Sequence, residues 1–448
     1  MAHALAGKPV QEQDIIDVQT IVDAYFDNVP DMTNPTQLVS FGTSGHRGTS
    51  VDGTFTDLHV AAITQAICDG RKQFGATGPI FVGQDTHALS QPALVTVLEV
   101  LAGNGVTAMV DCDMDFVPTP SVSRAIIRYN EEHDDKADGI IITPSHNPPD
   151  NGGIKYNTII GGPADTVVTK WIEMRANEYL TAYCESEDFK RISIDNIEPT
   201  AQVPYDYKGL YVEELGDVIN MEAIKAAGPK VLVDTLGGSG ASYWNAIKER
   251  YGLDLTIIHD DYDPTFSFMT YDHDGKVRMD CSSTYVMASV INRIGDFDLA
   301  VGNDPDYDRY GIVVSSGLIS ANTFLTLAAR YLFTTRGWKH KGVGKTVVCT
   351  TMIDKWAADA ETPVYEVPVG FKYFSQLLFD GAIGIGGEES AGASFLKKDG
   401  TVWTTDKDGM IMALLSMEIM AVMGKSELKM ADEFVEEFGN PSFGRIDV

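Results

Sequence analysis

The chain has 448 residues, of which 44% are hydrophobic and 22% are charged, a composition typical of folded globular proteins rather than disordered or fibrous ones. At roughly 150 residues per domain, this length predicts about three domains and excludes a single small module. The 64 Asp and Glu residues outnumber the 34 Lys and Arg residues, so the net charge is -30. Such a charge repels polyanions and anionic lipid surfaces, so we expect neither a nucleic acid nor a membrane as a partner.

The cysteines and the hydropathy pattern bear on the compartment. Five cysteines lie far apart, with no CxxC pair and no spacing typical of a metal site. The first ten residues lack the apolar segment of a secretory leader, and no uncharged apolar run reaches the roughly 18 residues of a membrane span. We therefore expect reduced cysteines and a cytoplasmic location. The most apolar segment, 410–422, contains Glu418 and is rich in methionine, and we predict that it forms a buried helix.

Short β-rich apolar runs alternate with helical patterns along most of the chain after about Val39. In the first third, the predicted elements are strand 79–83, helix 91–102, strand 106–110, helix 121–128 and strand 139–142. In the middle third, they are strand 230–234, helix 242–249, strand 253–258, helix 284–294 and strand 297–301. In the last third, they are helix 324–332, strands 346–350 and 364–367, helix 373–379, strand 382–385 and a final helix after Thr405.

This alternation predicts an α/β fold made of three consecutive similar α/β domains, each with a mixed, mainly parallel sheet and with the active-site cleft between them. Polar segments near 199–208 and 316–322 are the candidate boundaries. We therefore expect domains at 1–205, 206–320 and 321–448, the last with a C-terminal extension.

A polar loop follows the last predicted strand of each third. These loops read TPSHN at 143–147, GND at 302–304 and GGEES at 386–390. In open α/β sheets, ligands bind beyond the carboxyl ends of the strands. The three loops could therefore converge on one cleft.

The segment Asp304-Pro305-Asp306-Tyr307-Asp308 offers three carboxylates at alternate positions. In an extended segment such side chains project to one side, and three hard oxygen donors suit Mg²⁺. Arg309 and Ser315 occupy the positions where an EF-hand needs Gly and Glu, which excludes that motif. The alternative is an acidic, solvated turn.

Ser145 and His146 lie in the first of the three loops, and Lys155 follows it. A nucleophile elbow needs glycine two residues either side of its serine, but Thr143 and Asn147 stand there, which argues against an acyl-transfer triad. A serine that handles phosphate needs a cation and a nearby basic group, and His146 or Lys155 could supply the second. The alternative is a turn serine beside a surface lysine.

Further candidates for anion and sugar contacts lie elsewhere. The Gly-rich segment 41–48 includes Arg47 and could bring backbone N–H groups and a guanidinium to an anion. In the last third, Glu388 and Ser390 could bind sugar hydroxyls, while Lys407 and the segment 370–372 could reach a phosphate or hydroxyl. Each of these signals is weak alone.

Together these segments resemble the α-D-phosphohexomutase superfamily and, within it, its bacterial phosphoglucomutase branch, over nearly the whole chain. The motifs that carry the resemblance are GTSGHRG at 42–48, TPSHNP at 143–148 followed by GGIKYN at 152–157, NDPDYDR at 303–309 and GEESAGASF at 387–395.

The resemblance implies roles for the first two loops. It implies that Ser145 is the serine that becomes phosphorylated, and that a phosphoserine oxygen joins a set of Mg²⁺ ligands formed by Asp304, Asp306 and Asp308. It also implies that the reacting phosphate is surrounded by basic side chains, namely Arg47, His146, Lys155 and Arg309. Among these, Lys155 is the implied proton acceptor.

The resemblance implies sugar contacts in the last third. Glu388 and Ser390 would grip the sugar hydroxyls, Gly370, Phe371 and Lys372 would form a second sugar-contact loop, and Lys407 would lie near the cleft. Glu389 favours the glucose branch of the superfamily.

The implied reaction interconverts glucose 1-phosphate and glucose 6-phosphate, with glucose 1,6-bisphosphate as the intermediate and Mg²⁺ as the cofactor. Alternatives are a metal-dependent sugar phosphatase and a non-catalytic sugar-phosphate-binding relative. The exact sugar preference and the oligomeric state stay open.

Members of the superfamily normally carry a fourth, C-terminal domain with an Arg-Xaa-Ser-Gly-Thr loop that holds the non-reacting phosphate. The present sequence has no such segment. We therefore expect either a truncated form or a partner that supplies the missing part. Since that loop is the main anchor of the remote phosphate, we expect this chain alone to turn over weakly while still binding Mg²⁺.

Overall fold

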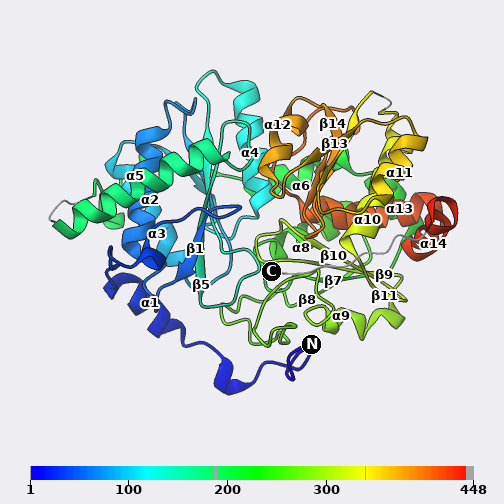
Figure 1. Ribbon diagram of the computed structural model, residues 1–448, viewed down its shortest axis with the longest axis horizontal. Helices are drawn as coiled ribbons and strands as arrows, with labels where there is room; N and C mark the ends of the chain where they lie inside the picture. Colours follow the sequence, from blue (N-terminus) through cyan, green and yellow to red (C-terminus); the bar gives the residue numbers. More distant parts are fainter. Residues whose placement is uncertain (1, 186–188, 339, 440–448) are drawn as a thin grey trace.

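The computed structural model describes residues 2–185, 189–338 and 340–439, and it contains three α/β units (Figure 1). The first unit has a six-stranded sheet with the order β1-β5-β4-β2-β3-β6. Its strands are β1 (His46–Thr49), β2 (Ile80–Gln84), β3 (Ala108–Asp111), β4 (Asp138–Ile142), β5 (Asn151–Asn157) and β6 (Gln202–Tyr205). Its helices are α1 (Val18–Asp27), α2 (Asp57–Gly70), α3 (Ser90–Gly103), α4 (Thr119–Glu132) and α5 (Thr166–Glu185).

The second and third units repeat this plan with smaller sheets, in the orders β11-β10-β9-β7-β8 and β13-β12-β14-β15. The second unit contains α6 (Tyr207–Val218), α7 (Met221–Ala227), β7 (Val231–Asp234), α8 (Ala241–Tyr251), β8 (Leu255–Ile258), α9 (Ala288–Ile291), β9 (Leu299–Asn303), β10 (Tyr310–Val314) and β11 (Gly317–Ile319). The third contains α10 (Ala321–Arg336), β12 (Gly342–Thr346), α11 (Met352–Asp359), β13 (Val364–Val367), α12 (Lys372–Phe379), β14 (Ile383–Gly387), β15 (Ala393–Phe395), α13 (Gly409–Met423) and α14 (Glu427–Phe438).

The sheets are mixed, with parallel central strands, so the predicted three-domain α/β fold is confirmed. In every unit one parallel strand turns back into an antiparallel neighbour: β4 into β5, β9 into β10 and β14 into β15. The three polar loops noted in the sequence are these connections. Since β6 ends at Tyr205 and β11 at Ile319, we propose the domain boundaries 1–205, 206–320 and 321–448, of which residues 1, 186–188, 339 and 440–448 lie outside the described part.

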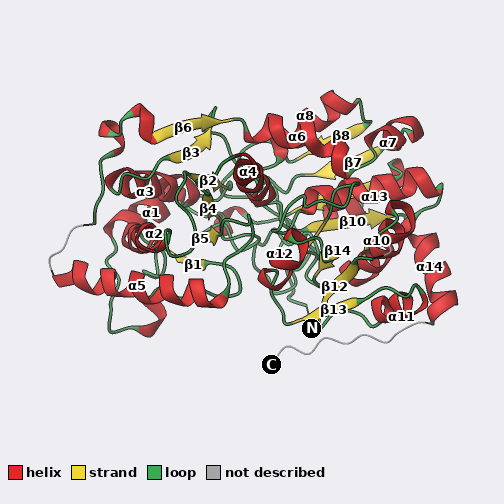
Figure 2. Cartoon of the chain, turned by 90° about the horizontal axis from the view of Figure 1, so that it is seen from above, coloured by secondary structure: helices red, strands yellow, loops and turns green. Residues whose placement is uncertain are grey.

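Helix α13 is the buried helix predicted at 410–422. It packs on α7, β9, β10 and β15, so it joins the second and third units (Figure 2). A helix that is apolar around its whole circumference is stable only when it is enclosed in this way. Across the described ranges, no single helix has both the length and the apolar character to cross a membrane. Helices α13 and α14 together are long and apolar enough, but the chain bends by 77° between them.

Two predicted elements differ from the structure. The helix expected at 284–294 is reduced to α9. At its expected start, the Tyr285 N–H donates to the Ser283 hydroxyl at 3.3 Å, a local bond that competes with helical hydrogen bonds. The strand expected at 346–350 lies at 342–346 instead. Its glycines are needed there, since a side chain at Gly344 would approach Phe374 to 2.9 Å, while the β-branched residues 347 and 348 lie in the exposed turn that follows.

Glu418 is the only acidic residue within α13, and it is 1% exposed, so its removal should affect stability. Its carboxylate accepts hydrogen bonds from the Arg336 guanidinium at 2.7 Å, the Tyr331 hydroxyl at 2.9 Å and the Asn220 N–H at 2.6 Å. We expect Glu418→Ala to destabilise the fold by about 3 kcal/mol, because it leaves the buried Arg336 without its counter-ion. The thermal midpoint should fall by roughly 5 °C or more, whereas Glu436→Ala, an exposed change on α14, should leave it unaltered. Equal midpoints for the two variants would contradict this assignment.

Candidate functional site

The loop between β9 and β10 brings Asp304, Asp306 and Asp308 together. One carboxylate oxygen from each lies within 4.8 Å of the others, and all three side chains are buried. The loop is a turn and not the extended segment expected from the sequence: the Tyr307 N–H donates to the Asp304 carbonyl at 2.8 Å, and Tyr307 adopts a left-handed conformation with φ 62°. The turn places the three carboxylates on one side, as the alternating side chains of an extended segment would also have done.

Lysines from two other elements balance these carboxylates. Lys155 of β5 places its ammonium 2.6 Å from Asp306 and 3.2 Å from Asp308. Lys407, which lies just before α13, reaches Asp308 at 2.8 Å. Burial and the neighbouring aspartates raise the pKa of Asp304 well above its usual value. Burial acts in the same direction on Asp308, but the two lysines outweigh it and hold its pKa below the usual range.

The donor set fits a hard divalent cation. Oδ1 of Asp306 and Oδ1 of Asp308 are buried and accept no hydrogen bond from the described residues. A buried carboxylate oxygen without a partner is costly, and a cation is one group that would satisfy it. Three carboxylates within reach of one another match the oxygen ligands that Mg²⁺ prefers, so these residues could hold it.

Ser145 lies in the loop between β4 and β5 and meets the aspartate loop directly. Its hydroxyl donates to Oδ2 of Asp304 at 2.8 Å, and the side chain is 1% exposed. Its backbone is left-handed, with φ 59°, and its N–H donates to the Thr143 hydroxyl at 2.7 Å. Thr143 in turn donates to the buried Asp85 at 2.6 Å. The bonds through Thr143 to Asp85 hold the left-handed serine within the first unit, and the bond to Asp304 joins it to the second.

His146 and Lys155 differ in charge. Burial and the nearby Arg309 lower the pKa of His146 to about 3, so its imidazole is neutral at physiological pH. Burial acts against the charged form of Lys155 as well, but Asp306 and Asp308 outweigh it and raise its pKa. Lys155 is therefore a charged donor here. Its strand runs close to the serine loop, since a side chain at Gly153 would collide with the Thr143 carbonyl.

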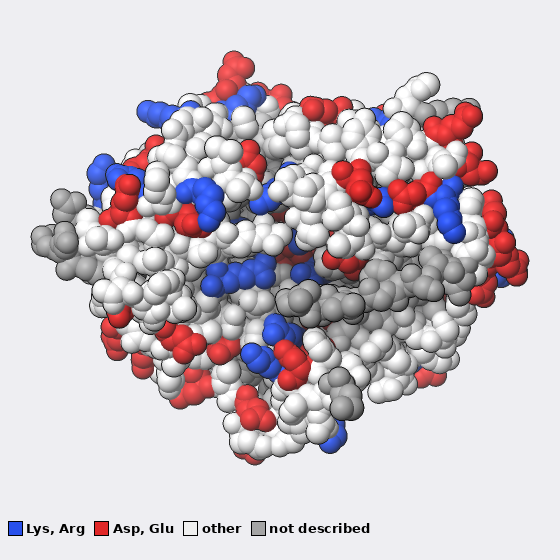
Figure 3. All heavy atoms as spheres, in the orientation of Figure 1, with Lys and Arg blue, Asp and Glu red and all other residues white. Residues whose placement is uncertain are grey.

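The two predicted arginines flank this centre. The Arg309 N–H donates to Oδ1 of Asp304 at 2.9 Å, and its guanidinium lies 3.5 Å from Asp280. Arg47 lies on β1, paired with Gly153 of β5, and its guanidinium donates to the Ser44 hydroxyl at 3.1 Å. In the space-filling view, several basic side chains lie close together near the centre of the face, while acidic side chains and other basic ones are spread over the rest of it (Figure 3).

The predicted sugar-binding residues lie on the third unit. Glu388 is buried in the loop between β14 and β15, and it accepts a hydrogen bond from the Gly370 N–H at 3.0 Å. Gly370 has φ 128°, and a side chain there would touch Thr43 of the first unit's Gly-rich segment at 3.4 Å. Ser390 is half-buried in the same loop as Glu388. Lys372 lies further out, with its ammonium 5.6 Å from the centre of the Tyr373 ring.

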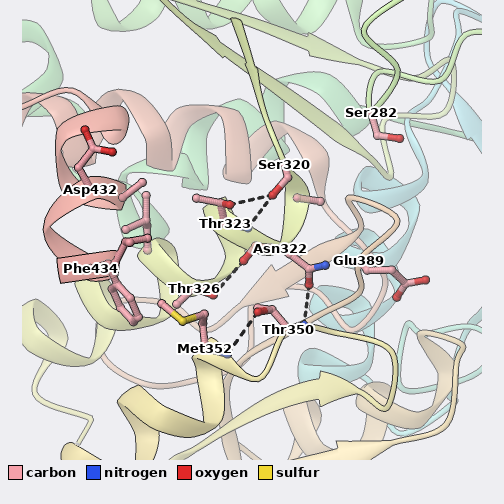
Figure 4. Close-up of a pocket in the computed structure, with 14 residues that line it drawn as sticks. Ser282, Ser320, Asn322, Thr323, Thr326, Thr350, Met352, Glu389, Asp432 and Phe434 are labelled. Atoms are coloured by element: carbon pink, nitrogen blue, oxygen red, sulfur yellow. Dashed lines mark hydrogen bonds between the residues drawn. The ribbon is translucent and has the colours of Figure 1, made fainter. Parts of the chain in front are cut away.

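Glu389 points elsewhere than Glu388. It lines a separate cavity of about 390 Å³ together with Asn322 and Thr350, which are joined by a hydrogen bond (Figure 4). Its carboxylate also accepts from the Thr346 hydroxyl at 3.0 Å. The two adjacent glutamates therefore face different surroundings.

Several residues of the site were missed by the sequence analysis. Asp85 follows β2 directly, so the rule that ligands lie beyond strand ends could have found it. Thr119 donates to Asp306, and Asp280 pairs with Arg309. Asp406 accepts a hydrogen bond from Asn157 at 2.9 Å and so joins the third unit to the first. These three depend on long-range contacts that no local pattern reveals.

Comparison with known proteins shows the family of this chain. Models described as phosphoglucomutase/phosphomannomutase, alpha/beta/alpha domains I, II and III match residues 38–182, 210–317 and 320–438. The chain belongs to the phosphoglucomutase/phosphomannomutase family.

Two members of the phosphoglucomutase/phosphomannomutase family show how far the similarity extends. A phosphoglucomutase from Komagataeibacter xylinus is 47% identical over 447 residues, which cover 99% of this chain and 80% of that protein. The crystal structure of a putative phosphomannomutase from Thermus thermophilus superposes with a TM-score of 0.75 at 25% identity, covering 90% of this chain and 84% of that one. The resemblance stated from the motifs is thus confirmed.

Removal of one carboxylate from the aspartate loop should weaken the binding of Mg²⁺. We expect Asp308→Asn to weaken Mg²⁺ binding by on the order of 100-fold or more, because it removes a charged oxygen donor. Isothermal titration with Mg²⁺ measures this, and Asp274→Asn is the control, since Asp274 belongs to a separate acidic group with Asp272 and His273. Unchanged affinity in Asp308→Asn, or an equal loss in the control, would contradict the assignment.

Proposed function

We propose that this chain interconverts glucose 1-phosphate and glucose 6-phosphate through a phosphorylated Ser145. The observation that carries the proposal is the 2.8 Å hydrogen bond between the Ser145 hydroxyl and Asp304. It joins a nucleophile of the first unit to the acidic loop of the second. The names of the phosphoglucomutase relatives support the same reaction.

The residues around Ser145 have complementary roles in this proposal. Asp304, Asp306 and Asp308 hold Mg²⁺, which supplies a positive charge to polarise the phosphoryl oxygens. Arg47, Arg309 and the neutral His146 bind and orient the phosphate. Lys155 exchanges a proton with the reacting hydroxyl. Because its own charge depends on Asp306 and Asp308, any cation bound to them reduces the field that keeps Lys155 protonated.

The third unit supplies the sugar contacts of the proposal. Glu388 and Ser390 form hydrogen bonds with the sugar hydroxyls. The Gly370 loop, whose N–H donates to Glu388, and Lys372 supply further contacts beside them. Lys407 lies between the sugar loop and Asp308. Glucose 1,6-bisphosphate is the intermediate. It must reorient within the cleft so that its other phosphate can return to Ser145.

The similarity to phosphoglucomutases favours a mutase over the alternatives. A metal-dependent phosphatase would transfer the phosphoryl group of Ser145 to water, whereas the 47% identical relative is named for transfer between sugar positions. A non-catalytic binding protein has no need of buried carboxylate oxygens without partners, which this chain retains in Asp306 and Asp308. We propose sugar phosphates as the ligands and the cytoplasm as the compartment.

Phosphorylation of Ser145 is the first test. After incubation with glucose 1,6-bisphosphate and Mg²⁺, we expect one phosphate per chain by intact mass, located on the Ser145 peptide. Ser145→Ala should take up no phosphate and lose at least about 1000-fold in turnover, because the nucleophile is gone. Ser242→Ala is the control, since the hydroxyl of that half-buried serine on α8 donates to Asp115, which is not among the proposed site residues. Phosphate on another residue, or activity retained in Ser145→Ala, would refute the assigned nucleophile.

Product analysis separates the reaction classes. With glucose 1-phosphate as substrate and a trace of glucose 1,6-bisphosphate, ³¹P NMR should show glucose 6-phosphate accumulating. A mutase keeps water from the phosphoserine while the sugar is bound, so inorganic phosphate should appear far more slowly. Inorganic phosphate as the main product would favour the phosphatase instead.

A further inference from the structure

The first turn of α4, in the first unit, touches the aspartate loop of the second. Thr119 is the first residue of α4 and is buried. Its hydroxyl donates to Oδ2 of Asp306 at 2.8 Å, and its backbone N–H donates to the Asp306 carbonyl at 2.9 Å. One residue thus holds both the side chain and the backbone of Asp306.

These bonds decide which oxygen of Asp306 stays available. Oδ2 receives both the Thr119 hydroxyl and the Lys155 ammonium, whereas Oδ1 has no hydrogen-bond partner in the described part of the chain. A carboxylate can rotate about its terminal bond at little cost, so a donor fixed on one oxygen sets the direction of the other. Thr119 therefore aims Oδ1 into the group formed with Asp304 and Asp308.

The backbone next to Asp306 is held from the loop's own unit. The N–H and the hydroxyl of Ser239 both donate to the Pro305 carbonyl at 2.8 Å, from the turn between β7 and α8. That contact fixes the backbone but leaves the carboxylate of Asp306 unconstrained. The hydroxyl that orients this side chain comes from the other domain.

We propose that Thr119 is a positioning residue that sets the orientation of Asp306 for divalent-cation binding and thereby couples the docking of the first two domains to cation affinity. This inference rests on the proposed function, specifically on the cation site. Groups that orient a metal ligand without touching the metal typically contribute 10–100-fold to metal affinity. We expect a loss within that range when the hydroxyl is removed.

The test is isothermal titration of the full chain with Mg²⁺ alone. Thr119→Val keeps the shape of the side chain but removes the donor, and it should weaken Mg²⁺ binding by about 10-fold or more. Thr119→Ser restores the donor and should bind within about threefold of the natural chain. If Thr119→Val does not fold, Thr119→Ala takes its place in the same titration.

Ser121→Ala is the matched control. Ser121 is also buried on α4, and its hydroxyl lies 3.0 Å from that of Tyr243 in the second unit, so it shares the domain contact but does not touch the aspartates. Its affinity for Mg²⁺ should be unchanged. Equal losses in Thr119→Val and Ser121→Ala would overturn the proposal in favour of simple loosening of the domains, and unchanged affinity in Thr119→Val would overturn it directly. If the natural chain fails to bind Mg²⁺, the cation site itself is wrong.

Discussion

The burial of three carboxylates in one loop is the constraint on which the arrangement of this protein depends. Asp304, Asp306 and Asp308 are taken out of water within a few ångströms of one another, which is unfavourable unless positive charge compensates. The compensating lysines come from other units: Lys155 from the first and Lys407 from the third. Ion pairs therefore connect all three domains of this strongly acidic chain at the aspartate loop.

The three loops that meet there share a backbone feature, a residue in the left-handed conformation. Each joins a parallel strand to an antiparallel neighbour, and each carries a non-glycine residue with positive φ: Ser145 at 59°, Tyr307 at 62° and Ala391 at 65°. Such conformations cost free energy and persist only where surrounding contacts enforce them. Here the contacts cross between units, as in the hydrogen bond from the Tyr310 N–H to the Ala391 carbonyl at 3.1 Å. The strain is thus held by the same docking that assembles the site.

The sequence predicted the α/β fold, the three loops and the residues that resemble the family motifs, because strand periodicity and loop chemistry are local properties. It did not predict the turn at Tyr307. It also did not predict the strand at 342–346, because packing there overrides the preference of the neighbouring β-branched residues for a strand. It also missed Thr119 and Asp280, whose partners Asp306 and Arg309 lie 187 and 29 positions away. Such residues carry no local signature, since only folding creates their contacts.

In the proposed mechanism, a phosphorylated Ser145 and the aspartate loop share one cation. Anomalous diffraction from Mn²⁺ in crystals of the phosphorylated chain would locate that cation. We expect one Mn²⁺ peak within roughly 2.5 Å of a carboxylate oxygen from each of Asp304, Asp306 and Asp308 and of a phosphate oxygen on Ser145. A peak at another place, or a phosphoserine too far away to share the ion, would contradict it.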